Sequence, residues 1–411
     1  MSTAPDFVPT WSAANITRLE QVARESARWL DGQFGTVQLC AATGNMAEAK
    51  ARLLSLYRRH RTRILGHPQL YHNFVGCFLA VGQFEFAAQI VNEKLGCSGW
   101  CDVTFGVDSP QPPNVLRWTV QNREGSAFQF SRDLYSVPNY QMIIANWLSC
   151  LPALEAYHHS EAWRRGEIAL NVGDHGVVPG LAFSDFRPNY FLIPDPQFQS
   201  TRAYQGVREF CARNDVRWED RIPLAFWRGA TTGRYPAPGV GNWRLLPRVR
   251  LCTLAQSRAD LFDVGLNRIV QIASPEDIHA IEEAGLMRSS VPDTTFNRYR
   301  YQIDIDGNSN SWAGLFIKLL TGSPVLKIAS PLGFRQWYYD LLEPWVNFVP
   351  IASDMSDLVE KAEWLRSDED RARRIGERGK ELAHFLSYDS EIKRCSDTLA
   401  AAFSFFNLPA N

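Results

Sequence analysis

The sequence lacks an excess of charge of either sign. Its 43 basic and 44 acidic residues leave a formal net charge of -1 over 411 residues. Nucleic acids and anionic bilayers attract basic proteins, so the charge of the whole chain favours neither, and we expect no nucleic-acid partner. The chain also lacks a run of the roughly 18 uncharged apolar residues that a membrane span needs. Its first residues lack a basic region followed by an apolar core.

Closely spaced cysteines are also missing. Among the eight cysteines only Cys97 and Cys101 lie near each other, and no second pair matches them. This pattern favours buried thiols over a zinc site or a redox pair. Reduced thiols fit a reducing compartment, so we expect a soluble, unprocessed, cytoplasmic protein, with peripheral association at the inner face of a membrane left open.

The N-terminal quarter, residues 1–98, is expected to be helical. Two segments there resemble each other, GNMAEAKARLLSLY from Gly44 and GQFEFAAQIVNEKL from Gly82, each a glycine turn followed by an alanine-rich amphipathic helix. Such pairs resemble helical repeats of the tetratricopeptide kind. A helical cap and a surface that binds a protein partner are equally compatible with this pattern.

Strands alternate with helices from about Trp118 to Pro350. This order predicts an α/β fold with parallel, doubly wound sheets, and the length predicts two of them. We expect a first Rossmann-like domain over residues 99–218, a second over 219–386, and a C-terminal helix at 387–411 that packs back. The segment FRQWYYDLL, residues 334–342, is also expected to be helical.

The stretch from Tyr299 to Ile328 predicts a strand, a polar turn at residues 307–311, a helix and a second strand. A helix that starts after such a turn offers free N–H groups and a partial positive charge to an anion. The turn is therefore a candidate phosphate site, although many such turns bind nothing.

Arginines gather in the segment before this unit. Arg228 and Arg234 flank a turn rich in glycine and threonine, and Arg244, Arg248 and Arg250 lie near the start of the next helix. Guanidinium groups match phosphate oxygens, so these residues could hold a diphosphate. They could equally form a solvated helix face. The nearby Gly239-Val-Gly241 lacks the third glycine of a dinucleotide fingerprint, and the chain has no P-loop.

Asp174 and His175 lie between two glycines after the strand expected at residues 167–172. Open α/β sheets place their chemistry at the carboxyl ends of strands. Asp174 is therefore a candidate catalytic carboxylate, and a turn or helix-capping aspartate is the alternative.

Several ordered strings resemble glycosyltransferase family 90. They are FWRGATTG, NWR, PRVRL, YQIDIDGNSNS, TGSPVLK, LEPWVNFVPI and IGERGKEL, and the resemblance covers roughly residues 167–386. The family includes protein O-glucosyl- and O-xylosyltransferases, fungal capsule-associated xylosyltransferases and bacterial relatives, and this chain resembles the bacterial type. The resemblance implies the GT-B fold of two Rossmann-like domains facing a cleft. It also implies a UDP-glucose or UDP-xylose donor as co-substrate, inversion of the anomeric carbon and no metal ion or other cofactor.

The resemblance also implies site residues. The family's strand-end motif with its catalytic aspartate matches Asn171 to Gly176, which assigns the base to Asp174. The expected donor-binding residues are Arg228, Gly229, Thr231, Thr232, Arg234, Arg248, Asp306, Gly307, Asn310, Ser311 and Lys318. Asp304 and Asp306 are open to two interpretations, strand structure for both or ribose contact for Asp306.

The chain departs from the better-known members at two places. Ala230 and Thr231 replace a serine and an arginine, and the turn before the 312–320 helix lacks the family's arginine. We expect transfer of a sugar to a hydroxyl of a glycan, glycolipid or protein, in lipopolysaccharide, capsule or other surface-glycan synthesis. The missing arginine supports an alternative, an inactive relative that acts as a scaffold in envelope-glycan assembly.

Overall fold

The computed structural model describes residues 36–37, 39–41, 43–66, 68–95, 100–109, 111–123, 125–136, 140–233 and 241–407. Its contacts divide the chain into two compact units, one of Met1–Ala182 with Ser396–Asn411 and the other of Phe183–Cys395. These limits differ from the domain boundaries expected after residues 98, 218 and 386. No helix in the described ranges is both long and apolar enough to cross a membrane.

The N-terminal part of the first unit includes the helices α3 (Met46–Gly66), α4 (Pro68–Ala80) and α5 (Phe84–Leu95). Gly44 and Gly82, which precede α3 and α5, both have left-handed backbones, with φ of +85° and +70°. Both turns also make the same pair of backbone hydrogen bonds to the preceding helical turn. The two similar segments therefore share a local geometry that glycine permits without strain. The helical segment expected before residue 36 lies outside the described residues.

A mixed sheet follows these helices, with strand order β1-β3-β2-β4-β5-β6. The strands are β1 (Cys101–Val107), β2 (Val115–Asn122), β3 (Gly125–Ser131), β4 (Gly166–Asn171), β5 (Gly180–Ala182) and β6 (Tyr190–Leu192). β2 runs antiparallel to both β3 and β4, whereas the sequence predicted parallel strands. Only two residues separate β2 from β3, and so short a link can join only antiparallel neighbours.

Helix α6 (Tyr140–His159) packs on this sheet through aromatic side chains. The Phe403 ring, from the later part of α14 (Tyr388–Phe406), lies 5.1 Å from the Trp118 ring and 5.5 Å from the Tyr157 ring. The C-terminal residues thus complete the core of the first unit, because both partner rings are fully buried.

The second unit holds a sheet in which all neighbours are parallel, in the order β11-β10-β9-β7-β8. The strands are β7 (Ile222–Ala230), β8 (Phe262–Arg268), β9 (Tyr299–Asp304), β10 (Val325–Ile328) and β11 (Val349–Ile351). The helices are α7 (Pro196–Ser200), α8 (Gln205–Arg213), α9 (Pro247–Gln256), α10 (Pro275–Glu283), α11 (Ala313–Leu320), α12 (Leu358–Ser367) and α13 (Glu369–Phe385). The expected α/β class with two sheets is confirmed.

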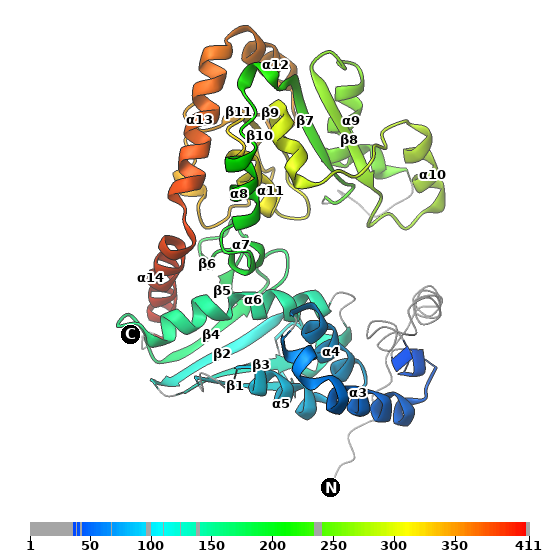
Figure 1. Ribbon diagram of the computed structural model, residues 1–411, viewed down its shortest axis with the longest axis vertical. Coiled ribbons are helices and arrows are strands. Elements are labelled where there is room, and N and C mark those ends of the chain that lie inside the picture. Colours follow the sequence, from blue (N-terminus) through cyan, green and yellow to red (C-terminus); the bar gives the residue numbers. More distant parts are fainter. Residues whose placement is uncertain are drawn as a thin grey trace. The chain divides into compact units, whose positions relative to one another are not determined.

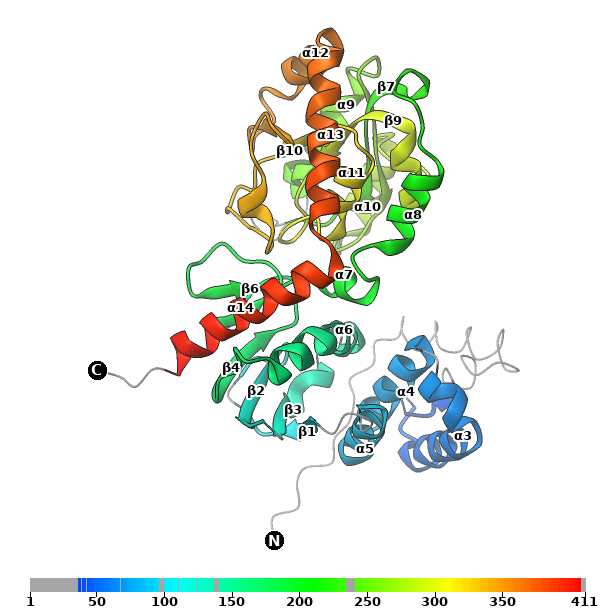
Figure 2. The same cartoon turned by 60° about the vertical axis from the view of Figure 1, so that its left-hand side comes forward.

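Both faces of this second sheet are covered, as Figures 1 and 2 show. Phe226 and Trp227 are adjacent on β7, so their side chains point to opposite faces. Trp227 joins an apolar cluster with α9, α10 and α12, while Phe226 joins a second cluster with α11. Burial on both faces explains why these strands are apolar runs rather than alternating ones.

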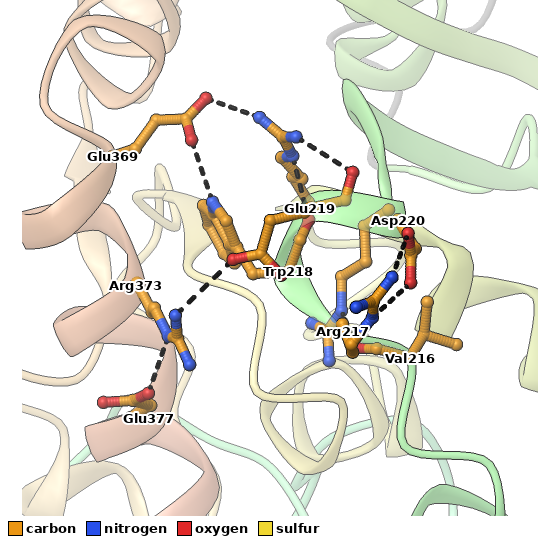
Figure 3. A network of polar contacts seen from close by, with 10 residues as sticks. Val216, Arg217, Trp218, Glu219, Asp220, Glu369, Arg373 and Glu377 are labelled. Atoms are coloured by element: carbon orange, nitrogen blue, oxygen red, sulfur yellow. Dashed lines mark hydrogen bonds and ion pairs between the residues drawn. The ribbon is translucent and has the colours of Figure 1, made fainter.

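Helix α13 is tied to the amino-terminal edge of the sheet by the polar network in Figure 3. Glu369, its first residue, accepts a hydrogen bond from Trp218 Nε1 at 3.0 Å and forms an ion pair with Arg300 of β9. Arg373 lies one turn further along and approaches Glu219 at 3.8 Å. The network fixes the amino ends of β7 and β9 and leaves their carboxyl ends for a site.

The helix expected over residues 334–342 is wrong. Only Tyr339–Leu341 form a short 3-10 turn there. Arg335 instead exchanges both backbone hydrogen bonds with Asp185, at 3.0 and 3.3 Å. A backbone paired in this way cannot also make the hydrogen bonds of a helix, and the pairing joins residues too far apart in the sequence to predict.

Candidate functional site

The candidate donor site lies where the direction of strand order reverses in the second sheet. The chain passes from β7 to β8 on one side and then returns to β9 on the other side of β7. Loops leaving the carboxyl ends of such a strand pair diverge, and open α/β sheets bind ligands in the crevice between them. Here the two loops are residues 231–233, after β7, and residues 305–312, after β9.

Arg248 joins these two loops. Pro247 starts α9, a position where its missing N–H is not needed, so Arg248 lies in the first helical turn. Its guanidinium donates to Thr232 Oγ1 at 2.6 Å and to the Ala230 carbonyl at 3.2 Å. It also donates across the strand pair to the Asp306 carbonyl at 2.9 Å and the Ile305 carbonyl at 3.3 Å. None of these acceptors carries a charge.

Burial lowers the pKa of Arg248 to about 10, so the group stays cationic at neutral pH. A buried cation is usually paired directly with an anion, and this one holds carbonyl groups instead. Gly307 lies against it, since a Cβ there would lie 3.0 Å from both Arg248 Nη2 and Thr232 Oγ1. The structure therefore brings together four of the predicted site residues, Thr232, Arg248, Asp306 and Gly307.

The loop after β9 also buries polar atoms that have no hydrogen-bond partner of acceptable geometry among the described residues. They are both carboxylate oxygens of Asp306, the Ser309 hydroxyl and the Asn310 amide nitrogen. The Ser309 and Asn310 residues are only 1% and 2% exposed. Buried polar groups are nearly always hydrogen-bonded in folded proteins, so ordered water or a polar ligand must supply the missing partners.

The electrostatics of Asp306 follow from its position. Burial raises the pKa of its carboxyl to about 6, although the Lys327 ammonium and the Ser330 hydroxyl, which is close but not in hydrogen-bonding geometry, act in the opposite direction. At neutral pH the carboxylate form still prevails. It can accept hydrogen bonds, and hydroxyl groups are the donors that a nucleotide sugar offers.

The turn ends in a strained residue. Trp312 has φ of +51° and ψ of -125°, a backbone region that side-chain-bearing residues rarely adopt. The Asn310 side-chain oxygen accepts from the Trp312 N–H at 2.6 Å, and Ser311 caps α11 by accepting from Leu315 N at 3.2 Å. Strain of this kind persists where the surrounding structure fixes it, and it gathers at functional sites.

Lys318 lies deeper than the sequence suggested. Its ammonium contacts Asp304 Oδ1 at 2.8 Å, and Lys327 contacts the other oxygen at 3.3 Å. Burial alone would raise the pKa of Asp304, but the two ammonium groups hold it well below its usual range. Asp304 therefore belongs to the strand structure, one of the two interpretations left open. The three groups together leave one positive charge beneath the turn.

Arg228, Gly229 and Thr231 make contacts within the sheet rather than at the Arg248 cluster. Arg228 Nη2 pairs with Asp263 Oδ1 at 2.5 Å, and its side chain is 10% exposed. A Cβ on Gly229 would lie 2.5 Å from the Trp227 ring. Thr231 Oγ1 donates to the Val270 carbonyl and accepts from its N–H. Direct contact of these three with a donor stays a prediction, and Arg234 lies outside the described residues.

Asp174, in the first unit, lies half-buried in the loop that follows β4. Asn171, fully buried at the end of β4, fixes this loop with all its hydrogen-bonding atoms. Its Oδ1 accepts from Val177 N and Val178 N at 2.7 and 3.1 Å, and its Nδ2 donates to the Val178 and Leu181 carbonyls, both at 2.8 Å. Sequence reasoning assigned no role to Asn171, although an asparagine at a strand end three residues before a candidate base was an available signal.

The family match lies within the second unit. Residues 202–392 match Glycosyl transferase family 90. Protein O-glucosyltransferase 3 of Homo sapiens is 28% identical over 243 residues, which cover 57% of this chain and 44% of that protein. Protein O-glucosyltransferase 2 of Danio rerio is 27% identical over 166 residues, covering 40% and 29%. Protein 035R of Invertebrate iridescent virus 3 is 28% identical over 174 residues, covering 39% and 14%. The chain thus spans less than half the length of these relatives.

Similarity to solved structures is weak. A pneumococcal O-GlcNAc transferase, GtfA, crystallised with UDP and GlcNAc, has a TM-score of 0.27 at 12% identity, covering 45% of this chain and 37% of its own. Sucrose-phosphate synthase from Thermosynechococcus elongatus has a TM-score of 0.33 at 10% identity, covering 77% and 94%. The sequence relatives come from vertebrates and viruses, so they do not single out the expected bacterial branch. Residues 202–392 of the chain are thus similar to Glycosyl transferase family 90.

Proposed function

We propose that the protein transfers a sugar from a nucleotide sugar, with UDP-glucose or UDP-xylose as donor, to a hydroxyl group of a glycan, glycolipid or protein. One observation carries the donor site. Asp306, Ser309 and Asn310 bury unpartnered polar atoms in the loop next to the Arg248 cluster, at the carboxyl edge of a parallel sheet. Such atoms need hydrogen-bond partners, and the match to Glycosyl transferase family 90 supports a sugar nucleotide as their source.

The chemistry of the three groups suits different parts of that ligand. The Asp306 carboxylate accepts hydrogen bonds from hydroxyl groups, which the ribose and the sugar both carry. The Asn310 amide nitrogen and the Ser309 hydroxyl can donate to diphosphate oxygens. Arg248, together with the excess positive charge of Lys318, Asp304 and Lys327, stabilises the negative charge that develops on the departing diphosphate.

Asp174 is the proposed base. It takes the proton of the acceptor hydroxyl as the oxygen bonds to the anomeric carbon and the bond to the diphosphate breaks. A single displacement of this kind inverts the anomeric centre. We propose that Arg248 and the lysines, rather than a metal ion, neutralise the negative charge of the diphosphate.

A cytoplasmic location and a role in lipopolysaccharide, capsule or other surface-glycan synthesis by a bacterial-type enzyme belong to the same proposal.

The test uses release of UDP from UDP-glucose and UDP-xylose, with and without acceptor. The wild type should release UDP, and Asp174→Asn should lose at least about a hundredfold in rate, the lower range for a missing general base, while binding UDP normally. Wild-type turnover by the variant would remove Asp174 from the mechanism.

A scaffold without transferase activity is the second candidate. The turn before α11 lacks the arginine that the resemblance to the family implies, Trp312 in this turn is strained, and Lys318 is engaged by Asp304. In that case UDP would raise the melting temperature but no donor would be consumed, and the N-terminal helices would supply the partner-binding surface.

A further inference from the structure

The outer face of helix α3 concentrates positive charge in a chain whose formal net charge is -1. This feature is outside the donor site, and the inference drawn from it does not depend on sugar transfer. The only acidic residue of α3 is Glu48. Its basic residues are Lys50, Arg52, Arg58, Arg59, Arg61 and Arg63.

Only part of this charge is neutralised. Arg52 pairs with Glu48 one turn away, and Arg61 pairs with Glu93 of α5. Arg58, Arg59 and Arg63 are exposed and form no ion pair with any described residue. Arg58 and Arg59 are adjacent, Arg63 lies beyond the kink at His60, and positive charge without counter-ions attracts anions.

The orientation of this face is fixed by the opposite side of the helix. Leu53, Leu56, Tyr57 and Ile64 are buried, and the Tyr57 ring stacks on Phe74 of α4 at 5.4 Å. α3 therefore cannot turn its arginines inward without exposing this apolar stripe. In addition, Lys94 of α5 donates to the Leu65 carbonyl, which adds a cation at the end of the same helix.

A shallow, open depression lies within the basic face. Its lining combines two guanidinium groups, a hydroxyl and a partly apolar floor, supplied by Arg58, Arg59, Ser55, Ala51 and Leu54. Guanidinium forks match phosphate oxygens, and the methyl and isobutyl groups of the floor suit the apolar parts next to a lipid phosphate.

We propose that this face of α3 binds an anionic phospholipid surface. α3 is kinked at His60, and the stretch before the kink presents the exposed Arg58 and Arg59 to a planar array of phosphates. Nucleic acid is a poorer fit because single strands stack on exposed aromatic rings, and the aromatic residue of α3, Tyr57, is buried. Lipid binding would bring the protein to a membrane without a spanning helix.

The experiment is co-sedimentation of the full chain with vesicles. Vesicles of phosphatidylcholine with phosphatidylglycerol should bind the wild type, while pure phosphatidylcholine vesicles should not. The double variant Arg58→Glu and Arg59→Glu should lower the apparent partition coefficient by at least about tenfold, since each basic residue near an anionic surface contributes substantially. The control Arg374→Glu and Arg378→Glu makes the same change of charge on exposed residues of α13 and should bind like the wild type.

Thermal unfolding of both double variants checks that the fold is intact. If both double variants lost vesicle binding to the same extent, the cause would be the general change of charge, and the assignment to α3 would be overturned. Failure of the wild type to prefer phosphatidylglycerol vesicles would also overturn it. The assignment would also be overturned if the wild type bound single-stranded RNA but not vesicles, and if the α3 double variant lost this RNA binding.

Discussion

Arg248 and Thr232 are joined by a hydrogen bond of 2.6 Å between the guanidinium Nη1 and the hydroxyl Oγ1. The same guanidinium also holds the carbonyls of Ile305 and Asp306, so it connects the ends of β7 and β9 at the candidate donor site. Arg248 is thus a positioning residue for both loops as well as a source of charge.

Replacing Arg248 by lysine keeps the charge but removes the planar fork. Carbonyls left without donors should lower the free energy of unfolding by about 2–4 kcal/mol, as expected for one or two buried groups that lose their partners. Hydrogen exchange of residues 305–312 should also become faster. Arg244→Lys, an exposed residue just before α9, is the control and should change neither quantity. If Arg248→Lys matches this control, the guanidinium does not fix the loops.

The pH dependence of stability should report on Asp306. Its folded-state pKa of about 6 is raised above the usual value of 3.8, so the folded state binds the proton more tightly than the unfolded state. The carboxyl therefore favours folding below pH 4, and this contribution is lost as the pH rises through 6. One pKa unit corresponds to about 1.36 kcal/mol, so the loss is about 3 kcal/mol.

Asp306→Asn removes this titration. The difference in unfolding free energy between variant and wild type should therefore shift in favour of the variant by about 2–3 kcal/mol between pH 4 and pH 7. Urea unfolding at a series of pH values measures it. A difference that stays constant with pH would show that the carboxylate is stabilised in the folded state by a partner.

Glu369 should matter to stability and not to the donor site. Glu369→Ala removes the acceptor of Trp218 Nε1 and the ion pair with Arg300, which should lower the free energy of unfolding by about 1–2 kcal/mol. UDP binding should stay unchanged because the network contacts residues at the amino ends of β7 and β9, whereas the donor site lies at their carboxyl ends. Glu377→Ala, which breaks only an exposed pair with Arg373, should cost less than about 0.5 kcal/mol. Equal effects of the two variants would contradict this account.

The sequence predicted the βαβ unit because apolar residues recur at every second position before the polar turn and at every third or fourth position after it. The same pattern marked the turn as a candidate phosphate site, whereas Asp306 and Asn310 were assigned to the donor by the resemblance to glycosyltransferase family 90. The role of Arg228 could not be foreseen because its partner, Asp263, lies on a different strand.

Other features depended on pairings that no local pattern reveals. Arg335 forms its backbone bridge with Asp185, which replaced an expected helix. β2 and β3 form an antiparallel hairpin, so the first sheet is mixed, whereas the sequence pattern predicted a parallel sheet. The position of Arg248 between two loops likewise arises from three segments that meet only in the folded chain.

The central claim is that the loop after β9 binds the nucleotide part of the donor, and calorimetric titration with UDP tests it most directly. Asn310→Asp keeps the oxygen that accepts from Trp312 N but replaces the buried amide donor by a carboxylate oxygen. The account predicts UDP binding to the wild type, at least about tenfold weaker binding to Asn310→Asp, and no change in Asn214→Ala, which alters an exposed residue at the end of α8. Unchanged affinity of a folded Asn310→Asp variant, or no UDP binding by the wild type, would contradict it.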